Sequence, residues 1–232
     1  MISFKCSAAC GDIIYTLPSV KELWKQNGFC EVVYYIDNKT HSKRQNVDTY
    51  KALKLLLEDQ EYISKCLPYD GQKVVFDFDG FRRLDYKKEP MPLSMAKTVG
   101  LNDVDYKSAW IDADLDVDSN NVLFNITKRY KGHEFKYLNK ARELWNQSGN
   151  LSFIGTYDEY LSSEISTYCR FCTESYTLYG AKLYIEDAKE IYCNQSSVLT
   201  IAQAMNHPNI NLFYVKGFNN VLLGKENVYE AY

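Results

Sequence analysis

Three short segments of the chain combine small or polar residues with the expected start of a helix, an arrangement suited to binding phosphate or carboxylate. Gly11 would let the backbone approach a ligand closely, and the unpaired N–H groups at a helix N-terminus attract negative charge. The alternative for every segment is a structural role, in which side chains cap the helix. The three segments are Cys10–Asp12, Asn125–Lys131 and Asn194–Ser197.

Asp12 has two candidate roles. As a helix N-cap it would accept hydrogen bonds from backbone N–H groups, a task that aspartate performs well. As a carboxylate that faces a ligand it would take a proton from an attacking hydroxyl and act as a general base. The two roles are compatible, and both follow from its position directly after Gly11.

The other two segments carry different groups. Three of the last four residues of Asn125–Lys131 are cations, which would either neutralise a diphosphate or form a solvated basic loop. In Asn194–Ser197, small polar side chains and the N–H groups of the following helix would cradle an anion. The alternative there is simple capping by one of the two serines.

The sequence predicts no metal site. Asp77-Phe78-Asp79 has a spacing that can hold a divalent ion, but alternation along a strand also brings two aspartates together without a ligand. The aspartates of Asp112–Asp118 resemble the start of a calcium loop, yet Val117 takes the position of the required glycine. Cys169 and Cys172 form a C-x-x-C motif without a second pair of zinc ligands nearby.

Strand and helix signals alternate along the chain, and the strands are apolar without strict polar alternation, which favours parallel sheets covered on both faces. Strands are expected at Ile2–Cys6, Glu31–Ile36, Tyr62–Leu67, Val74–Phe78, Val122–Ile126, Leu151–Ile154, Tyr168–Phe171, Glu190–Cys193 and Ile210–Tyr214. Helices are expected at Asp12–Gln26, Thr49–Leu57, Pro92–Val99, Glu134–Gln147, Tyr157–Glu164, Leu178–Asp187 and from about Ser196 to Met205.

An E-L-W string occurs twice, ending at Trp24 and at Trp145, each time in a helix that follows a strand and a loop. The repeat predicts two similar halves, and the alternative is one larger sheet. The predicted class is therefore α/β, with two Rossmann-like parallel-sheet domains that face a cleft. We place the domains at 1–118 and 119–232, joined by a tight connection because no Gly/Ser linker marks the junction.

Composition and charge limit the classes of function that the chain can have. The formal net charge of −3 argues against a protein that gains its affinity from nucleic-acid phosphates, although a local basic loop is compatible with it. The N-terminus has no signal-peptide pattern, and no uninterrupted apolar stretch reaches about 18 residues. The chain is expected to be cytoplasmic.

Several of these residues resemble one family. Gly11-Asp12-Ile13-Ile14 followed by Leu17-Pro18-Ser19-Val20 is similar to the opening of the heptosyltransferase-like glycosyltransferases, the family 9-like group with the GT-B fold. The second half resembles a bacterial and phage offshoot of that group, and a phage-encoded member would be expected in the host cytoplasm. Its matching residues are Asn125, Thr127, Arg129 and Tyr130, then Phe153–Glu159, then Asn194-Gln195-Ser196-Ser197 ahead of Ile201-Ala202 and Ala204.

The resemblance implies a metal-independent transferase without a cofactor, whose C-terminal domain holds a nucleotide-sugar donor and whose N-terminal domain holds a carbohydrate or other hydroxyl acceptor. Asp12 would be the base, Arg129 and Lys131 would stabilise the departing diphosphate, and the segment around Ser196 would cradle phosphate. The remaining residues implied in binding are Gly11, Asn125, Thr127, Tyr130, Gly155, Thr156, Glu159, Asn194, Gln195 and Ser197, with Gly155, Thr156 and Glu159 near the nucleoside.

The chain departs from the family at one of these positions. Heptosyltransferases carry an Asp-Thr-Gly turn where this chain has Asn194–Ser197, so a carboxylate and a glycine are missing. The chain is also shorter than the usual enzyme. Two alternatives therefore stand beside glycosyl transfer, namely a non-catalytic nucleotide- or sugar-binding module of the same fold and a phage-type transferase that modifies nucleic acid.

Overall fold

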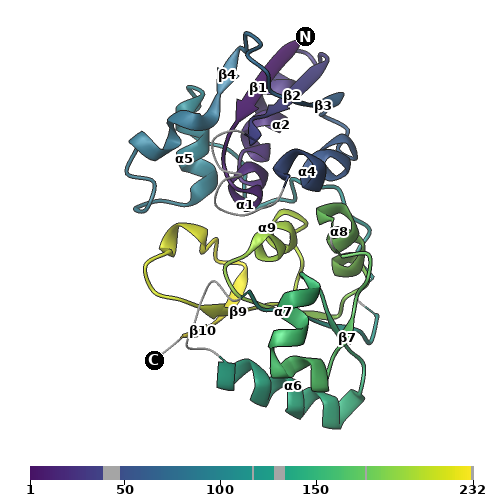
Figure 1. The fold of residues 1–232 in the computed structure, drawn as a ribbon. Helices are drawn as coiled ribbons and strands as arrows, with labels where there is room; N and C mark the ends of the chain where they lie inside the picture. Colours follow the sequence, from purple (N-terminus) through teal and green to yellow (C-terminus); the bar gives the residue numbers. More distant parts are fainter. Residues whose placement is uncertain (39–47, 117, 128–133, 176, 231–232) are drawn as a thin grey trace. The chain divides into compact units, whose positions relative to one another are not determined.

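The computed structural model describes residues 1–38, 48–116, 118–127, 134–175 and 177–230. The chain forms two compact units, Met1–Asp112 with Asn219–Leu223, and Ala113–Phe218 with Gly224–Tyr232 (Figure 1). The sequence placed the boundary between 118 and 119, whereas the chain leaves the first unit at Asp112. A short segment near the C-terminus returns to the first unit, where the buried Asn220 lies 3.9 Å from the sulfur of Met91.

The first unit contains a four-stranded parallel sheet in the order β3-β2-β1-β4. Its core is aromatic, with Phe4 of the central strand stacked against Phe76 and Phe78 at 5.2 and 6.0 Å between ring centroids. The elements are β1 (Ile2–Cys6), α1 (Cys10–Ile14), α2 (Leu17–Gln26), β2 (Val32–Ile36), α4 (Thr49–Glu58), β3 (Lys65–Pro68), β4 (Phe76–Asp77), the 3-10 helix η1 (Phe78–Arg83) and α5 (Met91–Thr98).

The single helix expected over Asp12–Gln26 is wrong, because α1 and α2 are separate helices. Pro18 has no N–H to donate to the carbonyl of Ile14, and its ring would clash with that carbonyl in a continuous helix. At the break the Thr16 hydroxyl donates to the carbonyl of Ile13 at 2.7 Å. The proline therefore lies in the first turn of α2, where its missing N–H does no harm.

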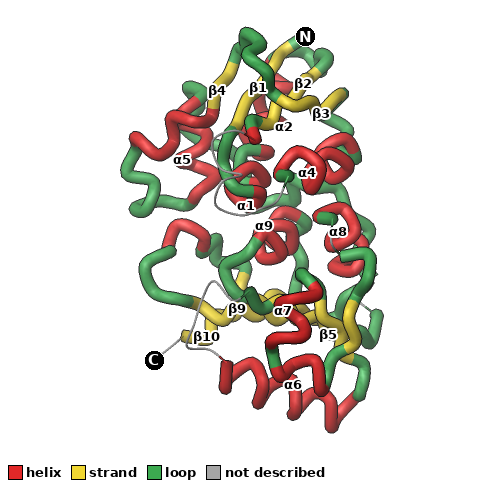
Figure 2. The backbone as a smooth tube through the Cα atoms, in the orientation of Figure 1, coloured by secondary structure: helices red, strands yellow, loops and turns green. Residues whose placement is uncertain are grey.

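The second unit contains a six-stranded parallel sheet in the order β10-β9-β8-β5-β6-β7. In Figure 2 its strands lie between α8 and α9 on one face and α6 on the other. The elements are β5 (Val122–Asn125), α6 (Glu134–Ser148), β6 (Leu151–Phe153), α7 (Tyr157–Ser162), η2 (Glu164–Thr167), β7 (Arg170–Phe171), α8 (Leu178–Glu186), β8 (Glu190–Cys193), α9 (Ser197–Ala204), β9 (Ile210–Tyr214), η3 (Asn219–Val221, part of the first unit) and β10 (Glu226–Glu230).

Two separate parallel sheets confirm the predicted α/β class and exclude the alternative of one larger sheet. The helices of the E-L-W repeat differ in how they pack. The ring of Trp24 on α2 packs edge-on against that of Phe29, with 4.7 Å between the ring centroids, whereas Trp145 on α6 is 42% exposed. Within the described residues, no helix combines the length and the apolar character that a membrane span requires.

Candidate functional sites of the two sheets

The second sheet has a topological switch point between β5 and β8. From β5 the chain builds outward through β6 and β7, and from β8 it builds in the opposite direction through β9 and β10. Open parallel sheets bind ligands in the crevice outside the carboxyl ends of the strands at such a point. The residues found there are Asn125 at the end of β5, Thr127 just beyond it, and Asn194–Ser197 after β8.

Three buried amides hold these strand ends together. Asn125 donates from Nδ2 to the carbonyl of Ile154 at 2.7 Å, so it joins the end of β5 to that of β6. Asn194 is bonded to the backbone of Thr127 twice, through Oδ1 at 3.3 Å and Nδ2 at 3.1 Å. Gln195 makes an equivalent pair with Val215 beyond β9. The amides were predicted to bind substrate; their hydrogen bonds give them the geometry of positioning residues.

Ser196 precedes α9 and leaves the first turn of that helix without its usual cap. Its hydroxyl donates to Oδ1 of Asn125 at 2.6 Å and makes no capping hydrogen bond. The first N–H groups of an α-helix have no partner within the helix. The start of α9, with the partly exposed Ser197, therefore presents backbone donors at the switch point.

The corner between β6 and α7 contains the three residues that the sequence linked to a nucleoside. Gly155 has φ +149°, and a Cβ there would lie 3.0 Å from the ring of Phe153 and 3.3 Å from Nδ2 of Asn125. Thr156 and Glu159 form a reciprocal capping box, with the carboxylate 3.1 Å from the Thr156 N–H. The glycine allows the backbone to pass close to Asn125, and the capping box fixes the start of α7.

The structure thus brings seven of the predicted residues into one hydrogen-bonded or closely packed group, and Gln195 lies beside it. The seven are Asn125, Thr127, Asn194, Ser196, Gly155, Thr156 and Glu159, of which Gly155 and Glu159 pack beside Asn125. Arg129, Tyr130 and Lys131 lie outside the described residues. Gly11 and Asp12 belong to the other unit.

The first sheet has its own switch point between β1 and β4, where Asp79 is the central residue. Its Oδ1 accepts the Ser7 N–H at 2.6 Å, and its Oδ2 accepts from the Lys5 ammonium at 2.5 Å. Burial alone would raise the pKa of Asp79, but hydrogen bonds from Lys5 and Ser7 outweigh it and lower that pKa. Burial would likewise lower the pKa of Lys5, and the bonds and charges of Asp79 and Asp77 raise it instead. Asp79 is therefore a fixed negative charge at this corner.

Asp12 belongs to the same unit and lies within α1, not at the N-cap of that helix. The N-cap residue of α1 is Ala9, so the capping role expected for Asp12 is wrong. The carboxylate is 3.6 Å from the guanidinium of Arg82, and its side chain is 29% exposed. Lys5 and Arg82 were missed as candidate functional residues, and Asp79 was considered only as part of a metal site. The signal that pointed to this corner is the acid pair Asp77 and Asp79, at the end of the strand that pairs with the first one.

Metal binding finds little support in this part of the molecule. Asp77 and Asp79 both contact the Lys5 ammonium, at 3.2 and 2.5 Å, and that cation takes the place that a divalent ion would need. Among the described residues, no group of three or more His, Cys, Asp or Glu side chains is arranged to hold a metal.

Comparison with known proteins finds similarity in structure only. Neither the family models nor the curated protein sequences compared with the chain match it. The E. coli heptosyltransferase WaaC, solved with ADP, superposes with a TM-score of 0.71 at 9% sequence identity, covering 99% of this chain and 92% of that one.

Two further solved structures give the same result. A glycosyl transferase family 9 protein from Veillonella parvula has a TM-score of 0.72 at 12% identity and covers 99% of this chain and 85% of its own. The E. coli ADP-heptose lipopolysaccharide heptosyltransferase II has a TM-score of 0.71 at 12% identity, covering 99% and 90%. The chain therefore has the two-sheet α/β fold of the GT-B heptosyltransferases.

Proposed function

We propose that the chain is a glycosyltransferase that moves a sugar from a nucleotide-sugar donor to a hydroxyl acceptor. The observation that carries the proposal is the start of α9 at the switch point of the second sheet, where the Ser196 hydroxyl bonds Asn125 and not the helix. Uncapped N–H groups and the positive end of the helix dipole suit a diphosphate. The similar heptosyltransferase WaaC was solved with ADP, which makes ADP the natural first probe.

In this proposal the second unit holds the donor. Phosphate oxygens would accept from the N–H groups of α9 and from the hydroxyl of Ser197, while Ser196 positions the start of the helix through its bond to Asn125. Gly155, whose missing side chain lets the backbone after β6 pass close to Phe153 and Asn125, would shape the corner that the nucleoside approaches. Thr127, Tyr130, Arg129 and Lys131 are proposed as further donor contacts, the two cations neutralising charge on the leaving diphosphate.

The proposed base is Asp12 of the first unit. The acceptor hydroxyl oxygen forms a bond to the anomeric carbon, the bond from that carbon to the phosphate oxygen breaks, and the diphosphate leaves with the electron pair. The proton of the acceptor goes to the Asp12 carboxylate. The guanidinium of Arg82 lies 3.6 Å from that carboxylate. No step requires a metal.

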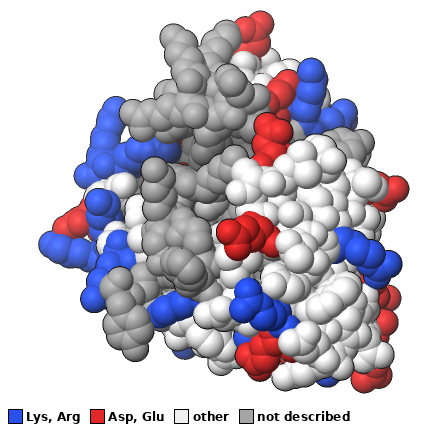
Figure 3. Space-filling view, turned by 60° about the horizontal axis from the view of Figure 1, so that its bottom comes forward, with Lys and Arg blue, Asp and Glu red and all other residues white. Residues whose placement is uncertain are grey.

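Surface charge supports a small-molecule donor over nucleic acid. The net charge is −3, and basic and acidic side chains are both present on the face in Figure 3, with wide uncharged areas beside them. Affinity for a nucleic-acid backbone rests on many cations arranged along it.

Thermal unfolding with nucleotides tests donor binding. ADP at a hundredfold excess over its Kd should add about 2.7 kcal/mol to the free energy of unfolding. Asp12→Asn should keep that shift and abolish release of diphosphate from nucleotide sugars offered with free-sugar acceptors. Asp70→Asn, on an exposed turn of the same unit, should leave both unchanged.

Two results would contradict the proposal. Absence of a shift with ADP, UDP, GDP and CDP would exclude donor binding. A shift in the wild type without any turnover over a panel of donors and acceptors would identify a binding module in place of a transferase.

A further inference from the structure

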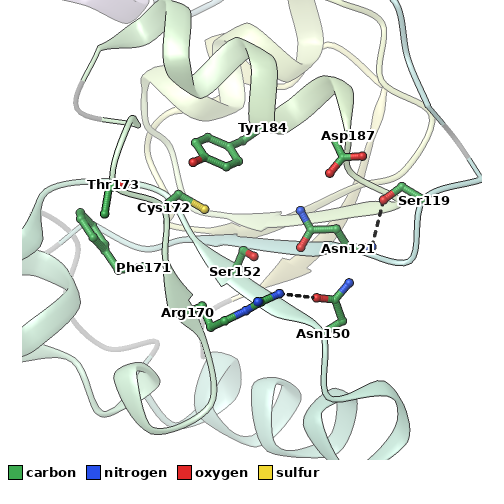
Figure 4. A pocket seen from close by; sticks show the side chains of 10 residues that line it. All are labelled: Ser119, Asn121, Asn150, Ser152, Arg170, Phe171, Cys172, Thr173, Tyr184 and Asp187. Atoms are coloured by element: carbon green, nitrogen blue, oxygen red, sulfur yellow. Dashed lines mark hydrogen bonds between the residues drawn. The ribbon is translucent and has the colours of Figure 1, made fainter.

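The second unit contains a pocket of about 380 Å³ that is separate from the switch-point corner. Asn121 and Asn150 line it directly before β5 and β6, and Asp187 lines it directly after α8 (Figure 4). Asn121 and Asn150 mark the amino-terminal ends of β5 and β6, and the pocket extends from there to Phe171, Cys172 and Thr173 at the carboxyl end of the edge strand β7. The proposed donor corner lies at the carboxyl ends of β5 and β8. The volume is near the lower end of the range for ligand pockets, about 300–1,000 Å³. The pocket therefore has room for a small ligand.

The floor of this pocket is polar where a sheet face under a helix usually buries aliphatic side chains. Leu151 and Phe153 of β6 enter the apolar core, while Ser152 between them lines the pocket. Asn121, Ser152 and Cys172 are only 9, 7 and 6% exposed. Burial raises the pKa of the Cys172 thiol to about 11, so that group is neutral. The floor thus offers uncharged hydrogen-bonding groups.

Asn121 is the residue that points to a ligand. Its backbone is held at both ends, the N–H by the Ser119 hydroxyl at 3.1 Å and the carbonyl by the Lys189 N–H at 2.9 Å. Its Oδ1, however, is buried without a hydrogen-bond partner among the described residues. Figure 4 shows the amide projecting into the pocket. Buried polar groups in native proteins almost always have a partner, and here a ligand can supply it.

The rim determines the charge of that ligand. Its cation is Arg170, which donates to Asn150 at 2.9 Å, and its anion is Asp187. The carbonyl end of α8, which is the negative end of its dipole, terminates at Asp187. That end disfavours a phosphate, and Arg170 disfavours a cation. The groups fit a neutral ligand.

We propose that this pocket binds a monosaccharide unit through neighbouring hydroxyl groups. A hydroxyl both donates and accepts, so two adjacent ones can satisfy Oδ1 and Nδ2 of the Asn121 amide together. Ser152 and Asp187 offer further partners, and the ring of Tyr184 on α8 forms an apolar wall for the C–H groups of a sugar. The site is distinct from the proposed donor corner and does not depend on it.

A titration of the full-length ¹⁵N-labelled protein tests the proposal. The probes are the methyl α-glycosides of D-glucose, D-mannose and D-galactose, each at up to tens of millimolar. At least one should cause saturable shifts of the Asn121 side-chain NH2 signal and of the Ser152 and Arg170 amides. ADP should leave these three signals unchanged, because its proposed corner lies at the other end of the strands.

Variants complete the test. Asn121→Ala should weaken sugar binding about tenfold, since it removes two hydrogen bonds. Asn120→Ala, the exposed neighbour of the same type, should bind as the wild type does. Ser152→Ala provides a second, conservative variant if Asn121→Ala fails to fold, and it should also weaken binding. The proposal is overturned if none of the sugars shifts these signals, if the Asn120 and Asn121 variants behave alike, or if adenosine or inorganic phosphate binds there in place of the sugars.

Discussion

Replacing Ser197 by proline removes one backbone donor from the start of α9 while leaving the helix intact. Ser197 is the first residue of α9, a position where proline is well tolerated. The preceding residue must be extended, and Ser196 already has φ −133° and ψ 176°. The free energy of unfolding without ligand should therefore stay within about 1 kcal/mol of the wild type. ADP binding should change far more.

The size of that change follows from the donor that is lost. A hydrogen bond to a charged group contributes about 1.5–3 kcal/mol, which corresponds to about a 10- to 100-fold weaker Kd for ADP. Ser197→Ala is the matched control, because it removes the hydroxyl and keeps the N–H. Isothermal titration calorimetry on both variants then isolates the backbone donor. Equal affinities for ADP in the proline and alanine variants would refute the phosphate-binding role of α9.

Two further predictions concern the folded state of each unit. Asp79→Ala should lower the free energy of unfolding by about 2–3 kcal/mol in urea titrations, because it removes an acceptor of charged and backbone donors; Asp77→Ala, with a side chain 49% exposed, should lower it by less than about 1 kcal/mol. Similar losses in both variants would contradict this. His207 is buried, its ring donates to the Ala188 carbonyl and accepts the Asn209 N–H, and burial lowers its pKa. Its folded pKa is thus below the unfolded value of about 6.5, so the folded state binds fewer protons and stability falls as pH drops below about 6.5. Between about pH 7 and pH 5 the wild type should lose more stability than His207→Gln, and parallel pH profiles would show that the histidine is not responsible.

Local sequence patterns defined most of the elements. The strands Glu190–Cys193 and Ile210–Tyr214 have the predicted bounds, because short apolar runs bordered by polar turns leave little choice of structure. The strand β10 was missed because its sequence contains no such apolar run. Its residues Val228 and Tyr229 are 43 and 39% exposed at the edge of the sheet, so no apolar run marks them. A single proline, Pro18, was enough to divide the predicted first helix.

The candidate sites were predicted in part. The sequence identified the strand-to-helix corners that carry Asp12, Asn125 and Asn194, since a change from strand to helix periodicity locates them. It did not show which of these side chains would form hydrogen bonds within the protein and so would not be free to bind a ligand. Asn125 and Asn194 hold strand ends together, and Asp12 meets Arg82 in place of capping its own helix.

The sequence by itself determined the class of fold, the alternation of strands and helices, and the corners where a ligand could meet a helix N-terminus. These depend on residues close together in the chain. Only the tertiary structure decided the order of the strands, and with it which distant residues meet, such as Ser7 with Asp79 and Asn125 with Ser196. It also left the Asn121 amide buried without a partner. Hydrogen bonds of this kind join residues about 70 positions apart, and no local pattern encodes them because sheet order is set by packing of the whole unit.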